Sequence, residues 1–322
     1  MKKTILLMLM ALLSSLSLSA CGGKETDGSP QQNKDKLDIY TTIYPLQYFT
    51  EEIGGQYVNV KTIYPPGSDE HTFEPSQKEM MNIADADLFI YVGLGLEGFV
   101  QKAEHVLRNQ NVELFAAGES LDLEELEHAK GQHEEGSKTE DDGHHHGDIN
   151  PHVWLDPLYA KQMAQSITDT LAKQMPEHKA EFEANNKELG KQFDELDASF
   201  ANAVAHANVR KIVVTHAAYT YWESRYHIEQ LPIAGISTTE EPSQKKLKEL
   251  VDTMGEDHLK YILFEQNAPS KIAGAIQKQT GANILHLHNL AVLTEKDINN
   301  KDNYFTLMEK NAEALKTALD NR

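Results

Sequence analysis

Cysteine is nearly absent from this 322-residue chain, in which Cys21 is the only one. A single thiol cannot form an intramolecular disulfide, so we expect the fold to be held by its hydrophobic core alone. Positive charge is also scarce, because 30 lysines and arginines face 50 acidic residues and the formal net charge is −20. This balance argues against nucleic acid or an anionic lipid surface as a partner and favours cations.

Long apolar runs are missing after the first twenty residues, and no later stretch predicts a membrane span. Residues 1–20 have the pattern of a signal peptide, in which two lysines precede the apolar core at 5–13 and small residues lead to Cys21. Residues 21–36 are polar and almost free of apolar side chains. We therefore expect a removed signal followed by a flexible tether.

From Leu37 onward, segments typical of buried strands alternate with segments typical of helices. The expected strands are 37–43, 58–64, 87–92, 112–115, 209–215, 228–236, 259–265 and 283–287. The expected helices are 46–53, 75–84, 96–108, 157–174, 176–207, 219–225, 243–254, 270–280 and 304–320. This alternation predicts an α/β fold with parallel sheets flanked by helices, whose strand carboxyl ends share one edge of each sheet.

The helix expected at 176–207 is the longest of the chain. Its apolar residues recur at helical spacing and form one stripe, made of Phe182, Leu189, Phe193, Leu196, Phe200 and Val204. At 1.5 Å per residue it would be roughly 45 Å long, which exceeds the needs of one small lobe. We therefore expect a first lobe at 37–175, a connecting helix at 176–207 and a second lobe at 208–322.

A tract rich in acid and histidine, residues 121–148, interrupts the first lobe. It contains ten acids against two lysines and few apolar side chains, so it is expected to be disordered. Its histidines are His128, His133, His144, His145 and His146. The tract lacks the metalloprotease signature H-E-x-x-H, because Ser137 stands where the second histidine would be. A solvated linker and a weak, multi-site metal trap both fit this composition.

Three isolated histidines follow expected strands: His71, His152 and His216. Ligands of parallel α/β sheets bind outside the strand carboxyl ends, so these imidazoles could meet between the lobes, two from the first and one from the second. Imidazole is a favoured ligand of zinc and of neighbouring transition metals. For each histidine taken singly, the alternative is an ordinary loop histidine or a hydrogen-bonded, half-buried one.

Gly93, Gly95 and Gly98 match the G-x-G-x-x-G pattern of dinucleotide-binding sites. They follow the third expected strand, whereas the dinucleotide pattern follows the first strand of its fold. We therefore interpret them as a tight turn from strand to helix.

Five segments carry a resemblance to a known family, and they lie at 44–45, 64–75, 93–97, 150–157 and 215–219. With them, the chain resembles the zinc-specific solute-binding lipoproteins of ABC importers, over essentially its whole length after the signal. The resemblance implies two lobes joined by a rigid helix, and an extracytoplasmic binding protein instead of an enzyme. It further implies a lipid anchor on Cys21, a monomer that binds no nucleic acid, and delivery of Zn²⁺ to a membrane permease and, through it, its ATPase.

The resemblance also implies a ligand set for zinc, consisting of His71, His152 and His216. Relatives often place a carboxylate just after the last strand of the second lobe, where this chain has Ala291. A water, Glu70 or His288 could take the fourth place, and Glu70 could equally be a solvated loop acid. Because each imidazole must be deprotonated to bind, affinity should fall as pH drops through about 6.5.

Rival functions remain open at this point. Manganese capture is one, although manganese prefers oxygen ligands and Ala291 supplies none. Zinc hydrolysis is another, because three histidines and a water also form catalytic sites, with Glu70 as the general base. An adhesin or a zinc store built mainly on 121–148 is a third alternative.

Overall fold

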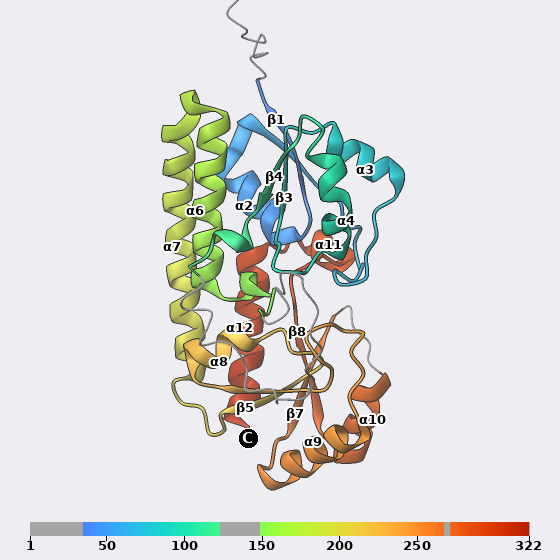
Figure 1. The fold of residues 1–322 in the computed structure, drawn as a ribbon. Coiled ribbons are helices and arrows are strands. Elements are labelled where there is room, and N and C mark those ends of the chain that lie inside the picture. Colours follow the sequence, from blue (N-terminus) through green and yellow to red (C-terminus); the bar gives the residue numbers. More distant parts are fainter. Residues whose placement is uncertain (1–34, 123–148, 267–270, 322) are drawn as a thin grey trace, which may run out of the picture. The chain divides into compact units, whose positions relative to one another are not determined.

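The structure, a computed structural model, describes residues 35–122, 149–266 and 271–321, and over these ranges the chain forms two parallel sheets flanked by helices (Figure 1). Lys36–Arg322 forms one compact unit. The expected signal, the lipidation candidate Cys21 and the five histidines of 121–148 lie outside the described residues. Within those ranges, no helix combines the length and the apolar character that a membrane crossing requires.

The sheet of the first lobe has the strand order β2-β1-β3-β4, and all neighbouring strands are parallel. Its strands are β1 (Leu37–Thr41), β2 (Val58–Thr62), β3 (Leu88–Tyr91) and β4 (Glu113–Ala116). Its helices are α2 (Tyr44–Gly54), α3 (Gln77–Ala84) and α4 (Gly98–Leu107). Ile39 of β1 lies beside Val60 and Leu88 in the register, and the carboxyl ends of the strands share one edge.

The sheet of the second lobe repeats this plan with the order β6-β5-β7-β8. Its strands are β5 (Lys211–Val214), β6 (Glu229–Pro232), β7 (Tyr261–Glu265) and β8 (Asn283–Leu287). The helices that follow its strands are α8 (Thr220–Tyr226), α9 (Gln244–Glu256), α10 (Lys271–Thr280), α11 (Glu295–Asn300) and α12 (Tyr304–Asp320). The strand expected at 228–236 is shorter in the structure and ends at Pro232.

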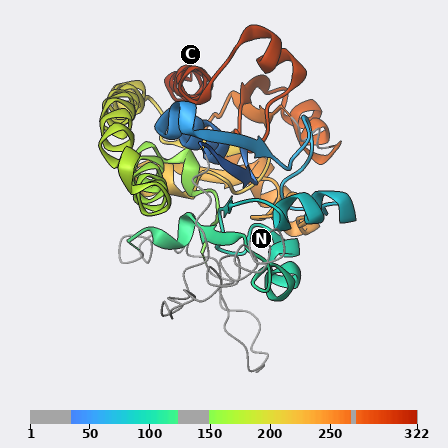
Figure 2. The same cartoon turned by 90° about the horizontal axis from the view of Figure 1, so that it is seen from above.

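Two long helices, α6 (Pro157–Gln174) and α7 (Lys179–Val204), pack side by side (Figures 1 and 2). Helix α7 contacts α2 of the first lobe and both α8 and α12 of the second, so it joins the lobes as expected. Its 26 residues make it about 39 Å long. It begins later than expected because Pro176–His178 forms a separate 3-10 turn. The whole apolar stripe expected for this helix is buried.

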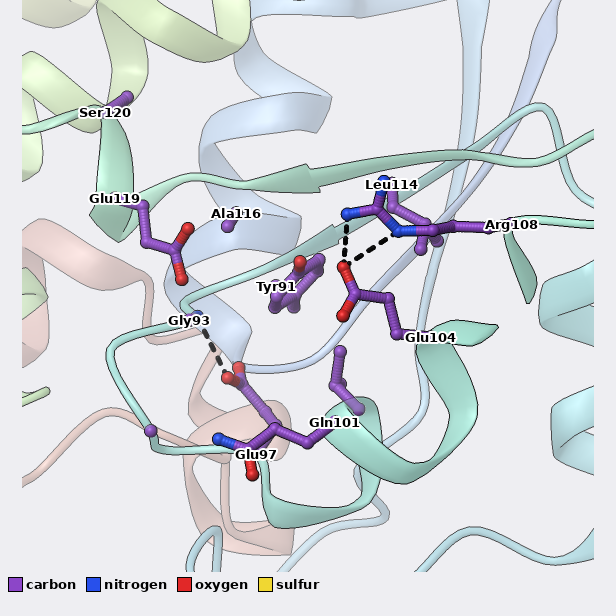
Figure 3. Close-up of a pocket in the computed structure, with 12 residues that line it drawn as sticks. Tyr91, Gly93, Glu97, Gln101, Glu104, Arg108, Leu114, Ala116, Glu119 and Ser120 are labelled. Atoms are coloured by element: carbon purple, nitrogen blue, oxygen red, sulfur yellow. Dashed lines mark hydrogen bonds and ion pairs between the residues drawn. The ribbon is translucent and has the colours of Figure 1, made fainter. Parts of the chain in front are cut away.

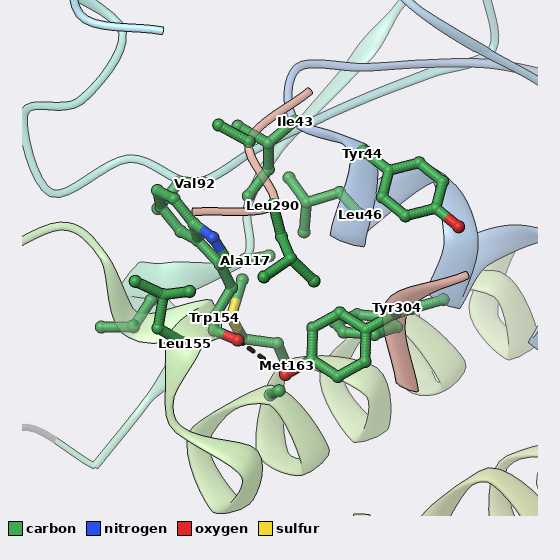
Figure 4. Close-up of a cluster of buried hydrophobic side chains, with 14 of the residues drawn as sticks. Ile43, Tyr44, Leu46, Val92, Ala117, Trp154, Leu155, Met163, Leu290 and Tyr304 are labelled. Carbon is green, nitrogen blue, oxygen red and sulfur yellow. Dashed lines mark hydrogen bonds between the residues drawn. The ribbon is translucent and has the colours of Figure 1, made fainter. Parts of the chain in front are cut away.

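One hydrophobic core runs from the first lobe into the second. Figure 4 shows Trp154 among side chains that include Ile43, the residue before α2, and Leu290 from the second lobe. The Trp154 indole donates a hydrogen bond to the Asn289 carbonyl at 2.7 Å, and its own carbonyl accepts one from the Tyr304 hydroxyl at 2.7 Å. The two lobes therefore share part of one hydrophobic core.

Three further local features differ from what the sequence led us to expect. Helix α3 begins at Gln77 and not at Pro75, because Ser76 and Glu79 form a reciprocal capping box. The six-residue helix α11 was not expected, since it is too short to show helical periodicity. Leu121, placed in the acidic tract, is 4% exposed and belongs to the core.

Candidate metal centre

The three isolated histidines come together at the carboxyl edges of the two sheets. His71 lies in the segment between β2 and α3, His152 precedes the 3-10 turn Val153–Leu155, and His216 comes two residues after β5. The Nε2 atom of His152 lies 3.2 Å from that of His71 and 3.2 Å from that of His216. Zinc held tetrahedrally by nitrogens at 2.0–2.1 Å requires nitrogens about 3.3 Å apart. The two nitrogen–nitrogen distances at His152 therefore suit a tetrahedral zinc site.

Glu70 is the fourth member of the cluster. Ligand atoms of Glu70, His71, His152 and His216 all lie within 4.8 Å of one another. The Glu70 Oε1 is 4.0 Å from the His71 Nε2, and the residue is 4% exposed. The alternative of a solvated loop acid is therefore wrong, because the side chain is enclosed together with the imidazoles.

His288 is not part of this cluster. Its Nδ1 accepts a hydrogen bond from the Leu290 amide at 2.9 Å, and its Nε2 lies 3.0 Å from Asp297 Oδ2. Because an accepting Nδ1 leaves the proton on Nε2, His288 donates to Asp297 and keeps no nitrogen for a cation. The expectation that it could take the fourth place is wrong. Ala291 is fully buried and offers no ligand atom.

Two of the imidazoles are oriented by partners behind them. The Nδ1 of His152 lies 2.7 Å from Asn150 Oδ1, and the Nδ1 of His216 lies 2.5 Å from Glu265 Oε1. Such contacts fix the proton on Nδ1 and leave Nε2 free to bind a metal. Sequence reasoning missed Glu265, although an acid that closes an apolar strand at the ligand-binding edge was a usable signal. It also gave Asn150 no role.

Asp69 holds the His71 loop in place across the lobes. Its Oδ1 accepts from the His71 amide at 2.9 Å and from the Thr72 amide at 3.1 Å. Its Oδ2 accepts from the Thr238 hydroxyl at 2.7 Å, in the segment after β6 of the second lobe. The loop that carries Glu70 and His71 is therefore fixed by both lobes.

The pKa values of the four clustered side chains are shifted in two directions. Burial, followed by the charge of His216, lowers the pKa of His71 to about 4, and burial holds the pKa of His152 well below its usual range. Burial alone would also lower the pKa of His216, but the charge and hydrogen bond of Glu265 outweigh it and raise that pKa. Burial raises the pKa of Glu70 to about 7. His71 and His152 are thus neutral at pH 7, whereas the raised pKa values of His216 and Glu70 make protons stronger competitors of a cation at these two groups.

The glycine pattern after β3 forms a tight turn, as interpreted from the sequence. Gly93 and Gly95 have φ values of +76° and +83°, which glycine adopts without strain. The Glu97 carboxylate accepts a hydrogen bond from the Val92 amide at 2.8 Å. It also accepts one from the Gly93 amide at 3.0 Å (Figure 3). A pocket of about 560 Å³ opens beside this turn. Since a carboxylate already occupies the amides that a phosphate would need, the turn does not form a dinucleotide site.

The fold and the cluster define a two-lobe metal-binding protein whose lobes are linked by a long helix. The chain belongs to the family described as zinc-uptake complex component A, periplasmic, whose model matches residues 39–318. It is 36% identical over 322 residues to the zinc-binding lipoprotein AdcA of Streptococcus pneumoniae, a match that covers 99% of this chain and 62% of the relative. It is also 33% identical over 304 residues to the high-affinity zinc uptake system protein ZnuA of Bacillus subtilis, covering 94% of each.

A solved structure shares the fold. The crystal structure of the Zn(II)-bound ZnuA-like domain of Streptococcus pneumoniae AdcA matches with a TM-score of 0.71 and 32% identity. The match covers 88% of this chain and 99% of that chain. The expected two-lobe α/β fold is therefore confirmed. The chain spans 62% of the length of the streptococcal AdcA proteins it matches.

Proposed function

We propose that this chain captures Zn²⁺ outside the cytoplasm and delivers it to the membrane permease of an ABC importer. The observation that carries the proposal is the convergence of three imidazole Nε2 atoms, with neighbouring pairs 3.2 Å apart. That spacing suits tetrahedral zinc. Relatives named for zinc binding and zinc uptake support zinc as the transported ion.

In this proposal, zinc is held by His71, His152, His216 and Glu70 and is cargo, not a cofactor. The role is binding without catalysis. Glu70 lies close enough to the imidazoles to be a ligand itself. A carboxylate that fills the fourth place leaves none for the water that a zinc hydrolase activates.

Nitrogen-rich ligation also disfavours the manganese rival. Manganese prefers oxygen ligands, whereas this cluster offers three imidazoles and a single carboxylate. Copper, nickel and cobalt are not excluded by the ligand types alone, because imidazole suits several of them. Selectivity among these ions would rest on geometry and supply.

The location and the partners belong to the same proposal. Cys21 would carry the lipid anchor, and a monomer tethered by 21–36 would meet the permease and, through it, the ATPase, with no nucleic acid involved. The name of one relative, a zinc-binding lipoprotein, supports the anchor. The histidines of 121–148 would act as an accessory, weak zinc-binding segment, because ordering flexible ligands around a metal costs conformational entropy.

A competitive zinc titration tests the proposal, with manganese run in parallel. The protein would be Lys36–Arg322 in which residues 123–148 are replaced by a short Gly/Ser linker, so that Leu121 keeps its place in the core. One tightly bound zinc per chain with weak manganese is the expected result. Tight manganese would favour the rival cargo, and loss of all tight binding would assign the metal to the removed segment.

A further inference from the structure

Asn289 joins two buried carboxylates beside the histidine cluster. Its Nδ2 donates to Glu70 Oε1 at 3.0 Å and to Glu265 Oε2 at 3.2 Å. Glu70 belongs to the first lobe, whereas Glu265 ends β7 of the second. All three residues are 4% exposed. A single amide therefore spans the boundary between the lobes at the point where the fourth group of the cluster lies.

The other contacts of the amide determine which of its atoms faces the carboxylates. The Ala291 backbone amide donates to Asn289 Oδ1 at 3.1 Å. A backbone N–H can only donate, so the atom that it meets must be the oxygen, and the nitrogen must face Glu70 and Glu265. Nδ2 carries two hydrogens, which is one for each carboxylate.

The backbone of Asn289 is held equally firmly. Its carbonyl accepts from Trp154 Nε1 at 2.7 Å, and its amide donates to Gln266 Oε1 at 3.3 Å. The preceding residue, His288, is clasped by Asn311, whose side chain both donates to and accepts from its backbone at 2.7 Å. The backbone that carries the Asn289 side chain is therefore fixed by several hydrogen bonds. A residue that positions a metal ligand needs such support.

We propose that Asn289 is a positioning residue that holds the Glu70 carboxylate on the cation bound by the three histidines. The inference rests on the proposed function and names how its fourth ligand is kept in place. The neutral amide satisfies one oxygen of Glu70 and leaves the remaining lone pairs of that carboxylate for a cation. Because Ala291 offers no ligand atom, the second lobe contributes to the fourth position through Asn289 acting on Glu70.

A double-mutant cycle on zinc affinity tests this role. Four proteins are compared by competitive titration: wild type, Asn289→Ala, Glu70→Ala and the double variant. Asn289→Ala should weaken zinc binding by about 10–100-fold, the usual effect of losing a partner that orients a metal ligand. In the Glu70→Ala background the same change should cost about threefold or less, because its target is gone. Equal losses in both backgrounds, or no loss in the first, would overturn the proposal.

A second variant and a matched control separate positioning from folding. Asn289→Asp keeps the size and the acceptor for Ala291 but removes the donor, so it should also weaken zinc binding. Wild-type affinity in Asn289→Asp would overturn the proposal. Asn185→Ala, which removes a hydrogen bond of 2.9 Å from α7 to the Ile53 carbonyl, should leave zinc affinity unchanged. Thermal unfolding of the zinc-free proteins would verify that each variant is folded.

The His152→Ala variant tests the proposed function independently of Asn289. If wild type binds zinc and His152→Ala abolishes the tight site, the proposed function stands whatever Asn289 does. If His152→Ala retains full affinity, the proposed function fails first. Cobalt bound in place of zinc gives a further readout, because the intensity of its d–d absorption changes with its coordination. Asn289→Ala should lower this intensity, whereas Asn185→Ala should leave it unchanged.

Discussion

Among the individual residues of the site, two have lowered pKa values that leave them ready to bind a cation, and two have raised pKa values. The pKa of His71 is lowered to about 4 and that of His152 lies well below its usual range, so both are neutral under ordinary conditions. The pKa values of His216 and Glu70 are raised, the latter to about 7. Protonation of His216 and Glu70 therefore controls how zinc affinity responds to pH.

We expect zinc affinity to fall as pH drops below about 7. Glu70, with a pKa of about 7, is increasingly protonated below pH 7, and zinc must then displace its proton in order to bind. Competitive titrations between pH 5.5 and 8.5 should show the fall, together with proton release in buffers of different ionisation enthalpy. Glu70→Gln should reduce the number of protons released. A flat affinity across this range would contradict the assignment.

Replacing any of the three histidines by alanine should abolish tight binding. Loss of a mere orienting partner costs about 10–100-fold, and loss of a direct ligand should cost on the order of a hundredfold or more. His288→Ala serves as the control, because that ring is engaged with Asp297 outside the cluster. Its zinc affinity should stay within a few-fold of wild type. A comparable loss in His288→Ala would contradict the ligand set.

The sequence supported the placement of the histidines better than that of their partners. Each histidine follows a strand, and parallel sheets place strand carboxyl ends at a shared edge, so His71, His152 and His216 could be brought together by reasoning. The burial of Glu70 could not be foreseen in this way. Glu70 is hydrogen-bonded to Asn289, which lies 219 positions further along the chain. Contacts of that kind have no local pattern.

Among the secondary-structure elements, helix α7 packs against both lobes. Phe193 in its middle is fully buried and packs edge-on against Phe49 of α2, with centroids 5.3 Å apart. Its ring centroid also lies 5.7 Å from that of Tyr304 and 5.1 Å from that of Phe305, both in α12. One ring therefore contacts helices of both lobes.

Phe193→Ala should lower the free energy of unfolding by about 3–5 kcal/mol, because it removes a large side chain and leaves a cavity. Urea unfolding of the zinc-free protein measures the change. Glu195→Ala, at an exposed position of the same helix, should change stability by about 0.5 kcal/mol or less. A loss below about 1 kcal/mol for Phe193→Ala would show that α7 does not hold the lobes together.

Elements with a long periodic pattern were predictable, whereas their ends were not. The stripe of α7 and the apolar strand β3 show clear spacing, and both form where expected. Pro75 suggested a helix start, but the capping box of Ser76 and Glu79 moved it to Gln77. A capping box contributes only a few hydrogen bonds, and its effect on where a helix begins is similar in size to the preference of proline for the first turn.

Across the whole molecule, the cluster takes ligands from both lobes, so zinc should stabilise them as one unit. At free zinc 1,000-fold above the dissociation constant, binding adds about 4 kcal/mol to the native state. For a chain of this size, this added stability corresponds to a rise of roughly 8–16 °C in Tm. Calorimetry of Lys36–Arg322 with and without zinc measures it. His152→Ala should show no such rise, and a rise in that variant equal to wild type would place the zinc elsewhere.

The most direct test of the central claim is zinc K-edge X-ray absorption. The sample would be Lys36–Arg322 with residues 123–148 replaced by a Gly/Ser linker and loaded with one equivalent of zinc. We expect three imidazoles and one oxygen donor, with Zn–N distances of about 2.0–2.1 Å. Fewer than three imidazoles would contradict the claim that His71, His152 and His216 hold the zinc.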